Sequence, residues 1–414
     1  MLYCSQSNDA KPHIPDKDTD LSAAWTASLT ISQNIPTEIV SEPAQLVSAV
    51  RAIGGFSAIA LDTESNSFHH YPEQLCLIQI ATRERAYVVD TIAFDALWPL
   101  KETLENAAVM KVIHGADYDV RSLDRRYGFH IVNLYDTSIA ARFAGIARFG
   151  LADLIKELLG VTIAKSKRLQ LTDWGRRPLS AEALDYAITD VTHLLDLQEV
   201  LSKRLEKLGR TAWVAEECER VEAVRYAEPD AERALLSMRG AKDLDGRGLA
   251  ILRSLVMFRE NEARRLQRPP FHIVPDVALV SLAGNPTARH QDIPGLGEEA
   301  QYKYGRGIIE AIREGLAATP VTRPASNFER PDREEIERLK RLKSWRTSLG
   351  ASLSLDASLV WPAVSLERLA RAPSTFDREM SSPDIRTWQR EQFGESLRSY
   401  LELQARGAGA RLHQ

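Results

Sequence analysis

The sequence lacks the long apolar stretches and the paired cysteines of membrane-spanning and disulfide-stabilised proteins. No uninterrupted apolar run approaches the roughly 18 residues that a membrane-spanning helix needs. The three cysteines, Cys4, Cys76 and Cys218, lie far apart and form no CxxC pair, which argues against a disulfide framework or a zinc site. Residues 1–20 contain neither a basic start nor an apolar segment, so they predict a loose polar extension rather than a secretory signal. We therefore expect a soluble protein of the reducing cytoplasm.

An excess of positive charge is also missing, although this does not exclude a nucleic-acid partner. The net charge is −4, from 53 basic and 57 acidic residues. A protein that binds a polyanion needs only a local basic surface, and an enzyme that holds cations beside a phosphate also needs local carboxylates. The 44% hydrophobic and 27% charged residues are typical of globular proteins, and 414 residues favour two or three domains.

The first half of the chain mixes strand and helix patterns. Apolar runs typical of strands, the second and third separated by the turn-like sequence TRER, lie at 56–65, 74–81, 85–90 and 109–114. The turn predicts antiparallel neighbours. A helical stretch at 98–108 and a helix beginning near Ala116 flank the fourth run, which adds a strand-helix unit. We therefore predict an α/β domain with a mixed sheet.

Beyond Leu151 the pattern is mostly helical. The sequence LADLIKELLG ends at Gly160, as helices often do. Residues 180–209 predict one long helix, with Ser180 as its N-cap and Glu182 in its first turn. Strand patterns almost vanish after Pro229, so the C-terminal half is expected to be helical.

An internal repeat runs through this C-terminal half. An offset of 87 residues, from Leu252 to Leu339, aligns LRSLVMFR with LKRLKSWR without a gap, and it also aligns Pro275 with Pro362. Shared apolar spacing occurs in unrelated helices, but shared prolines at a fixed offset are not needed for an amphipathic helix. We therefore favour a duplicated small helical domain, with the proline-rich polar residues 319–331 as a linker.

Acidic residues recur at spacings that bring them together within strands and helices. Asp62 and Glu64 are two apart at a strand end, so both side chains leave the same face of the sheet. Asp119 lies just inside a predicted helix, and Tyr186 and Asp190 are four apart on another helix, one above the other. Singly, such motifs usually mean a solvated edge or an ordinary helix pair. In combination, on these element types and in this order, they indicate a site.

Four converging carboxylates predict a divalent-metal site. Without water they would repel each other by several kcal/mol unless cations neutralise them. Mg²⁺ and Mn²⁺ favour oxygen ligands, and two such ions roughly 3.5–4 Å apart can activate a water and stabilise a leaving oxygen. The pattern therefore favours phosphodiester hydrolysis.

A family resemblance covers about residues 41–205. It rests on the strings LDTES, YPEQLCLIQI, KVIHGADYDV, LYDTSIAARFAG, KSKRLQLTDWGRRPLS and YAITD, which resemble the DEDDy 3′→5′ exonucleases of the ribonuclease D branch. The resemblance implies a ribonuclease H-like fold and two Mg²⁺ or Mn²⁺ ions, with metal ligands at Asp62, Glu64, Asp119 and Asp190. It further implies that Tyr186 positions the attacking water beside Glu64, which makes Glu64, Tyr186 and Asp190 the catalytic group. Ser65 departs from the pattern, because many members carry an aromatic or larger residue there.

Two helical domains of the HRDC type (helicase and ribonuclease D C-terminal) are implied by a second resemblance. The first match, about 235–318, includes IPGL and YGRGIIEAI, whereas the second, about 333–404, lacks the glycine-bearing IPGL turn, so a plain helical scaffold or a protein contact stays open there. The expected division is a flexible extension 1–36, an exonuclease domain 37–228, a first HRDC domain 229–318, a linker 319–332, a second HRDC-like domain 333–406 and a tail 407–414.

Candidate RNA contacts are basic residues near the acidic set. Between Val161 and Pro178 five basic side chains face the single acid Asp173, and we select Lys165, Lys167 and Arg168 as phosphate contacts, each equally consistent with a solvated loop. His114 is a further candidate, with a structural hydrogen bond as its alternative. Trp174 could stack on a base, but it more often packs in a core. A cationic helix face is predicted at 338–346.

The expected activity is the removal of nucleoside 5′-monophosphates, one at a time, from RNA 3′ ends. The resemblance implies structured substrates such as tRNA precursors. A DNA exonuclease is the second hypothesis, because only contacts to the 2′-hydroxyl distinguish the two substrates. An inactive RNA-binding module is the third, although the complete set of four acids with Tyr186 argues against it. A monomer is expected, since one chain supplies both a cleft and helical grips.

Overall fold

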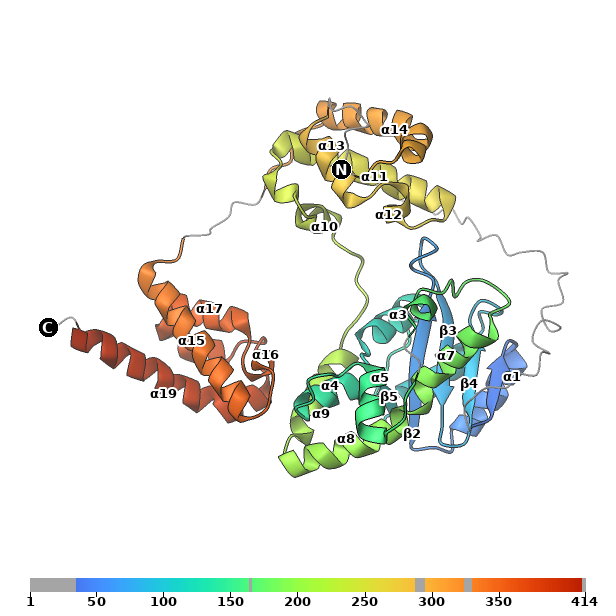
Figure 1. Ribbon diagram of the computed structural model, residues 1–414, viewed down its shortest axis with the longest axis horizontal. Coiled ribbons are helices and arrows are strands. Elements are labelled where there is room, and N and C mark those ends of the chain that lie inside the picture. Colours follow the sequence, from blue (N-terminus) through green and yellow to red (C-terminus); the bar gives the residue numbers. More distant parts are fainter. Residues whose placement is uncertain (1–34, 164–165, 287–294, 324–329, 412–414) are drawn as a thin grey trace.

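The computed structural model describes residues 35–163, 166–286, 295–323 and 330–411, with side chains up to residue 403. Three bodies follow one another along the chain (Figure 1): a sheet domain from β1 to α9, a first helical unit from α10 to α14, and a second helical unit from α15 to α19. Within the described residues, no helix combines the length and the apolar character that crossing a membrane requires.

The sheet domain is built on a six-stranded mixed sheet in the order β1-β4-β3-β2-β5-β6. The predicted antiparallel strands are adjacent as expected, namely β2 (Ala58–Ser65), β3 (Leu75–Ala81) and β4 (Ala86–Asp90). Parallel strands extend both sides of this meander, namely β1 (Thr37–Val40), β5 (Met110–Ile113) and β6 (Leu134–Asp136). Every residue of β3 and β4 is buried, which explains why their sequences read as continuous apolar runs. The predicted α/β class is confirmed.

Helices cover this sheet and position its edges. The N-terminal part contributes α1 (Pro43–Ile53), α2 (Trp98–Glu105), α3 (Asp117–Tyr127) and α4 (Thr137–Phe143). The predicted helix LADLIKELLG consists of α5 (Leu151–Leu154) and a π-helical turn (Ile155–Leu159), and it ends at Gly160 in the left-handed conformation, as expected. The short helix α6 (Lys167–Gln170) follows, and α9 (Thr211–Glu222) is the last helix of the domain.

The segment predicted as one long helix is divided at His193. It forms α7 (Ala181–Thr192) and α8 (Leu194–Leu208), and Ser180 caps α7 as predicted by accepting from the Ala183 backbone N–H. The hydroxyls of Thr189 and Thr192 donate to carbonyls one turn earlier, a bonding pattern that bends helices. α7 packs on β2, β3 and β4, and α8 continues along the sheet to contact β2 and β5 (Figure 1).

The two helical units repeat one fold. The first contains α10 (Ala231–Ser237), α11 (Gly246–Leu266), α12 (Pro270–Ile273), α13 (Asp276–Gly284) and α14 (Glu298–Ala317). The second contains α15 (Arg333–Ser352), α16 (Ala357–Val360), α17 (Ala363–Arg371), α18 (Phe376–Met380) and α19 (Thr387–Arg411). The predicted offset holds for both bounds of the second and third helices of the repeat, from α12 to α16 and from α13 to α17.

Matching hydrogen bonds support the duplication. Asp245 and Asp332, at equivalent positions, cap the matching helices α11 and α15 by accepting from a backbone N–H three residues later. Arg259 donates to the Val274 carbonyl at 3.1 Å, and the equivalent Arg346 donates to the Trp361 carbonyl, also at 3.1 Å. These shared internal contacts are not required by apolar spacing alone, so the structure supports two copies of one ancestral unit.

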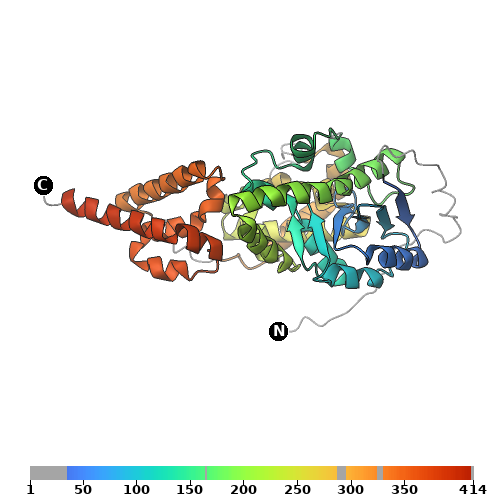
Figure 2. The same ribbon diagram turned by 90° about the horizontal axis from the view of Figure 1, so that it is seen from below.

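The two units attach to the sheet domain differently. The second unit shares a continuous hydrophobic core with it, in which Trp388 stacks on Trp213 with ring centroids 4.8 Å apart and Arg386 pairs with Glu217 at 2.8 Å. Both views of the structure place α19 beside the α8–α9 end of the sheet domain (Figure 2). The first unit has a core of its own and contacts the sheet domain through Tyr71, whose hydroxyl donates to Glu260 at 2.5 Å.

Candidate active site

Three of the predicted metal ligands lie close together. Asp62 and Glu64 extend from β2, just before a register shift between Glu64 and Ser65, and Asp190 extends from α7 above them. One carboxylate oxygen from each of the three lies within 4.8 Å of the others. The spacing of two in a strand and the packing of α7 on that strand therefore bring together residues far apart in the sequence.

Asp119 joins this group from a different direction. It is 4% exposed at the start of α3, and its carboxylate accepts a hydrogen bond of 2.6 Å from the Thr63 hydroxyl. Its charge is one of the groups that raise the pKa of both Asp62 and Glu64, so the fourth acid faces the same site. Asp117, two residues earlier, instead pairs with Arg121 in solvent.

Burial and mutual repulsion dominate the electrostatics of the cluster. Burial, and then the charges of the other three acids, raise the pKa of Asp62 well above its ordinary range. Burial, and then the charges of Asp190 and Asp119, raise the pKa of Glu64 to about 9. Burial raises the pKa of Asp119 to about 7 and that of Asp190 to about 7, against hydrogen bonds from Thr63 and Tyr186 that lower them. The charged cluster requires neutralisation, and this all-oxygen ligand set fits a hard divalent cation such as Mg²⁺ or Mn²⁺.

Tyr186 lies one helical turn before Asp190 and points to the same place. Its hydroxyl hydrogen-bonds to Asp190, while burial and the charges of Asp190 and Glu64 raise its pKa. The phenol therefore keeps its proton and remains a hydrogen-bond donor at neutral pH. Trp174 packs behind it, 1% exposed and with ring centroids 6.3 Å apart, which confirms the predicted core position of this tryptophan.

A tight turn between β5 and α3 sets the start of the helix that carries Asp119. Gly115 has φ +77°, a conformation that a side chain would strain. The Asp136 carboxylate accepts from the backbone N–H groups of Gly115 and Ala116 at 3.0 and 2.8 Å, and it also caps α4 through Ser138 and Ile139. Asp136 therefore couples the starts of two helices.

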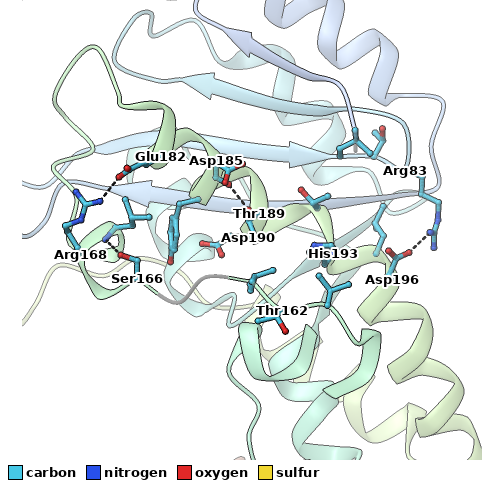
Figure 3. Close-up of a pocket in the computed structure, with 18 residues that line it drawn as sticks. Arg83, Thr162, Ser166, Arg168, Glu182, Asp185, Thr189, Asp190, His193 and Asp196 are labelled. Carbon is cyan, nitrogen blue, oxygen red and sulfur yellow. Dashed lines mark hydrogen bonds and ion pairs between the residues drawn. The ribbon is translucent and has the colours of Figure 1, made fainter. Parts of the chain in front are cut away.

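A cleft of about 890 Å³ opens beside Tyr186 and Asp190 (Figure 3). It runs along α7 and the start of α8, and its opposite wall includes Thr162, Ser166 and Arg168. At one end Arg168 pairs with Glu182 at 2.5 Å, and at the other Arg83 pairs with Asp196 at 2.8 Å (Figure 3). Tyr186 and Asp190 therefore line an open groove that has an ion pair at each end.

The predicted RNA contacts fall into separate positions. Arg168 lines the cleft, and Lys167 is exposed next to it on α6. Lys165 lies outside the described residues. The Nδ1 atom of His114 is 2.9 Å from the Thr137 hydroxyl, and burial lowers the pKa of His114, which matches the structural alternative.

Part of the predicted basic strip serves the fold. Arg177 holds the buried Asp90 carboxylate through two contacts of 2.6 Å and is itself largely buried, so its charge is already used. The expected cationic face at 338–346 is also reduced, because Arg338 donates to the Ala370 carbonyl and Arg346 to that of Trp361. Charge runs in the sequence do not show which arginines have internal acceptors.

Several residues of the site were not identified from the sequence. Thr63 holds Asp119, Gln170 hydrogen-bonds to Tyr186, and Asp136 organises the turn before Asp119. Of these, only Asp136 has a local signal, because an aspartate that follows a strand and precedes a helical run is a typical N-cap. The other two act across elements distant in the sequence.

Comparison with known proteins assigns both parts of the chain. Residues 37–206 match the model of the 3′-5′ exonuclease family, and residues 248–312 match that of the HRDC domain. Ribonuclease D of Gluconacetobacter diazotrophicus is 31% identical over 350 residues, which cover 81% of this chain and 86% of that protein. Ribonuclease D of Zymomonas mobilis subsp. mobilis is 33% identical over 299 residues, which cover 70% of this chain and 75% of that protein.

Solved structures share the arrangement of sheet domain and helical units. The crystal structure of Escherichia coli RNase D, an exoribonuclease involved in structured RNA processing, superposes with a TM-score of 0.66 at 24% identity, covering 89% of this chain and 99% of that one. At that identity the likeness speaks for the fold. Together with the sequence relatives and the exonuclease match, it shows that the chain belongs to the ribonuclease D family and is a hydrolytic 3′→5′ exoribonuclease.

Proposed function

We propose that the enzyme hydrolyses RNA from the 3′ end with two Mg²⁺ or Mn²⁺ ions held by Asp62, Glu64, Asp119 and Asp190, releasing nucleoside 5′-monophosphates. The observation that carries this proposal is the convergence of the Asp62, Glu64 and Asp190 carboxylates, together with the charge of Asp119, which raises the pKa values of Asp62 and Glu64. Such a cluster becomes fully ionised only when cations occupy it.

The chain's own groups hold the reacting parts. When bound, the ions supply charge stabilisation to the attacking and leaving oxygens of an in-line displacement. Tyr186, whose hydroxyl donates to Asp190, orients a water beside Glu64 by accepting a hydrogen bond from that water at its phenol oxygen. Asp119, fixed by Thr63, completes the ligand set from the α3 side. Arg168 and Lys167 lie where a phosphate entering the cleft from α6 would pass.

Structured RNAs, including tRNA precursors, are the proposed substrates. The similar E. coli enzyme acts in structured RNA processing. This chain likewise carries a helical unit, matched to the HRDC domain, after its nuclease domain. The proposed division of the chain is that expected from the sequence, with an exonuclease domain at 37–228 and helical domains at 229–318 and 333–406. A cytoplasmic monomer is proposed, and the buried free thiols of Cys76 and Cys218 fit a reducing compartment.

The test replaces one ligand and one matched acid. Asp62→Asn or Asp190→Asn should abolish nucleotide release from a 3′-labelled single-stranded RNA while RNA binding is kept. Asp117→Asn is the control, because Asp117 lies on the same helix as Asp119 but pairs with Arg121 in solvent. Chelation should silence the wild type, and hydrolysis retained by Asp62→Asn would refute the metal assignment. A matched DNA strand, expected to be the poorer substrate, tests the sugar preference.

A further inference from the structure

Gln79 in β3 has a side chain for which the structure shows no hydrogen-bond partner. The residue has 0% of its surface exposed, and both its amide nitrogen and its amide oxygen are buried without a partner. More than nine in ten buried polar groups in proteins are hydrogen-bonded, so an unpartnered primary amide at the centre of a sheet calls for an explanation. A leucine or a methionine would fill the same space without an unpaired polar group.

The register of the sheet places this amide beside a metal ligand. Gln79 lies directly across from Asp62 in the antiparallel pairing of β2 and β3, so both side chains leave the same face of the sheet. Directly opposed residues have Cβ atoms about 4.5–5.5 Å apart, which is within reach of a glutamine amide. On the other side, the partner of Gln79 on β4 is Val88, whose side chain has no polar atom.

The face that both residues share is closed by the helix that carries the remaining catalytic groups. α7 packs on β2, β3 and β4, and it brings Asp190 close to Asp62. Gln79 is therefore enclosed between the sheet and α7, at the inner side of the acidic cluster. Neither Gln79 nor Asp62 lines the cleft beside Tyr186 and Asp190. From its buried position the Gln79 amide can therefore reach the Asp62 carboxylate on the side away from that cleft.

We propose that Gln79 is a positioning residue for the metal site: its amide N–H holds the carboxylate oxygen of Asp62 that does not face the cation. This inference rests on the proposed function, because it assumes that Asp62 is a ligand. A ligating carboxylate needs its second oxygen hydrogen-bonded if its orientation is to be kept, and such outer partners commonly tune metal affinity. The Gln79 amide, which has no other hydrogen-bond partner among the described residues, is available for this role.

A buried amide without a partner lowers the stability of the fold when no metal is bound. The proposal can therefore be tested by two measurements that should respond differently, the Mn²⁺ affinity and the thermal midpoint. The variants are Gln79→Leu and, as a nearly isosteric second choice, Gln79→Met, both in the full chain. Mn²⁺ affinity is measured by titration calorimetry, and the thermal midpoint is measured in the presence of a chelator. We expect Mn²⁺ to bind about 10- to 100-fold more weakly, whereas the metal-free midpoint should be unchanged or higher.

Gln389 provides a matched control. It is also buried, at 2% exposure, but its amide donates to the Leu359 carbonyl at 2.7 Å in the second helical unit. Gln389→Leu should lower the thermal midpoint and leave Mn²⁺ affinity at the wild-type value. The two glutamines then separate the loss of a satisfied amide from the loss of a metal-site partner.

Two results would contradict the proposal or its basis, and a third would support it. If both Gln79 variants keep the wild-type Mn²⁺ affinity while Asp62→Asn loses Mn²⁺ affinity, the role of Gln79 alone is overturned. If Asp62→Asn also bound Mn²⁺ as the wild type does, the metal assignment itself would fail. Weaker Mn²⁺ binding together with an undiminished metal-free midpoint would support the proposal.

Discussion

The Thr63 hydroxyl donates a 2.6 Å hydrogen bond to the Asp119 carboxylate, and this bond ties α3 to the strand that carries Asp62 and Glu64. Thr63 lies between these two acids in β2, yet its side chain leaves the opposite face of the strand. One short segment of strand therefore supplies two of the proposed metal ligands and orients a third, so the geometry of the cluster depends on how α3 packs against β2.

Replacing this threonine by valine should separate the bond from the volume. Thr63→Val keeps the shape but leaves a buried carboxylate without its donor, which costs about 1–3 kcal/mol of stability. Because Asp119 is then free to turn, nucleotide release should fall at least about tenfold, on the scale of losing an outer partner of a metal ligand. Urea unfolding and initial rates at saturating Mg²⁺ measure the two effects. A variant with wild-type rate and stability would show that Asp119 is held by its helix alone.

The metal-free enzyme should lose stability as the pH rises. The pKa of Glu64 is about 9 and those of Asp119 and Asp190 are about 7 in the folded chain, above the ordinary carboxyl values near 4. Between those limits the folded state binds more protons than the unfolded chain, so the free energy of unfolding decreases with pH. With a chelator, the thermal midpoint should therefore fall across this window.

Divalent cations should reverse that trend. Cations bind the ionised carboxylates and compete with protons, so the midpoint with Mg²⁺ should rise relative to the chelated sample as the pH increases. Glu64→Gln, which removes the group with the pKa of about 9, should flatten the upper part of the chelated curve. A chelated wild-type midpoint that climbs through the same range would contradict the assigned pKa directions.

Tyr186→Phe should reduce turnover while leaving the metal site occupied. The phenol donates to Asp190 and keeps its proton because burial and nearby acids raise its pKa. Loss of one oriented donor at a reacting centre typically lowers kcat by about 10²- to 10³-fold. Single-turnover rates and Mn²⁺ calorimetry on the same preparation check this. A tenfold or larger loss of Mn²⁺ affinity would instead assign Tyr186 to holding Asp190 in place.

Trp388→Ala should destabilise the sheet domain and the second helical unit together. Trp388 is 3% exposed, stacks on Trp213 and contacts Phe143 edge-on at 5.2 Å, so it belongs to the core shared by the second helical unit and the sheet domain. Truncation of such a residue costs about 3–5 kcal/mol. Trp98→Ala, at a position 66% exposed, is the matched control and should cost far less. A separate early transition for the second unit in calorimetry, with the sheet domain unaffected, would argue against a shared core.

The sequence was informative wherever spacing alone decides which side chains share a face. Two residues apart in a strand, or four apart in a helix, point the same way in any protein, so the pairing of Asp62 with Glu64 and of Tyr186 with Asp190 could be predicted. The repeat was visible because apolar residues and prolines recur at a fixed offset. Ser180 caps its helix as predicted, and the adjacent antiparallel strands follow their turn signals.

What the sequence left undecided are contacts between distant elements. The interruption of the helix at His193 was not predicted, because apolar periodicity continues through it. The hydroxyls of Thr189 and Thr192 donate to helix carbonyls one turn earlier and so compete with the backbone for these acceptors. Arg177 belongs to the basic strip that was predicted to contact phosphate. The sequence does not show that Asp90 is its internal partner. The sequence likewise has no local signal for the second helical unit sharing a core with the sheet domain.

The primary structure by itself determined the acids, their order and the elements that carry them, because local backbone geometry is the same wherever a strand or a helix forms. Only the tertiary structure decided which acids meet, that Thr63 holds Asp119, and that Gln79 lies unpaired beside Asp62. Those relations depend on strand register and on the packing of α3 and α7, which are set by many weak contacts across the whole domain rather than by neighbours in the chain.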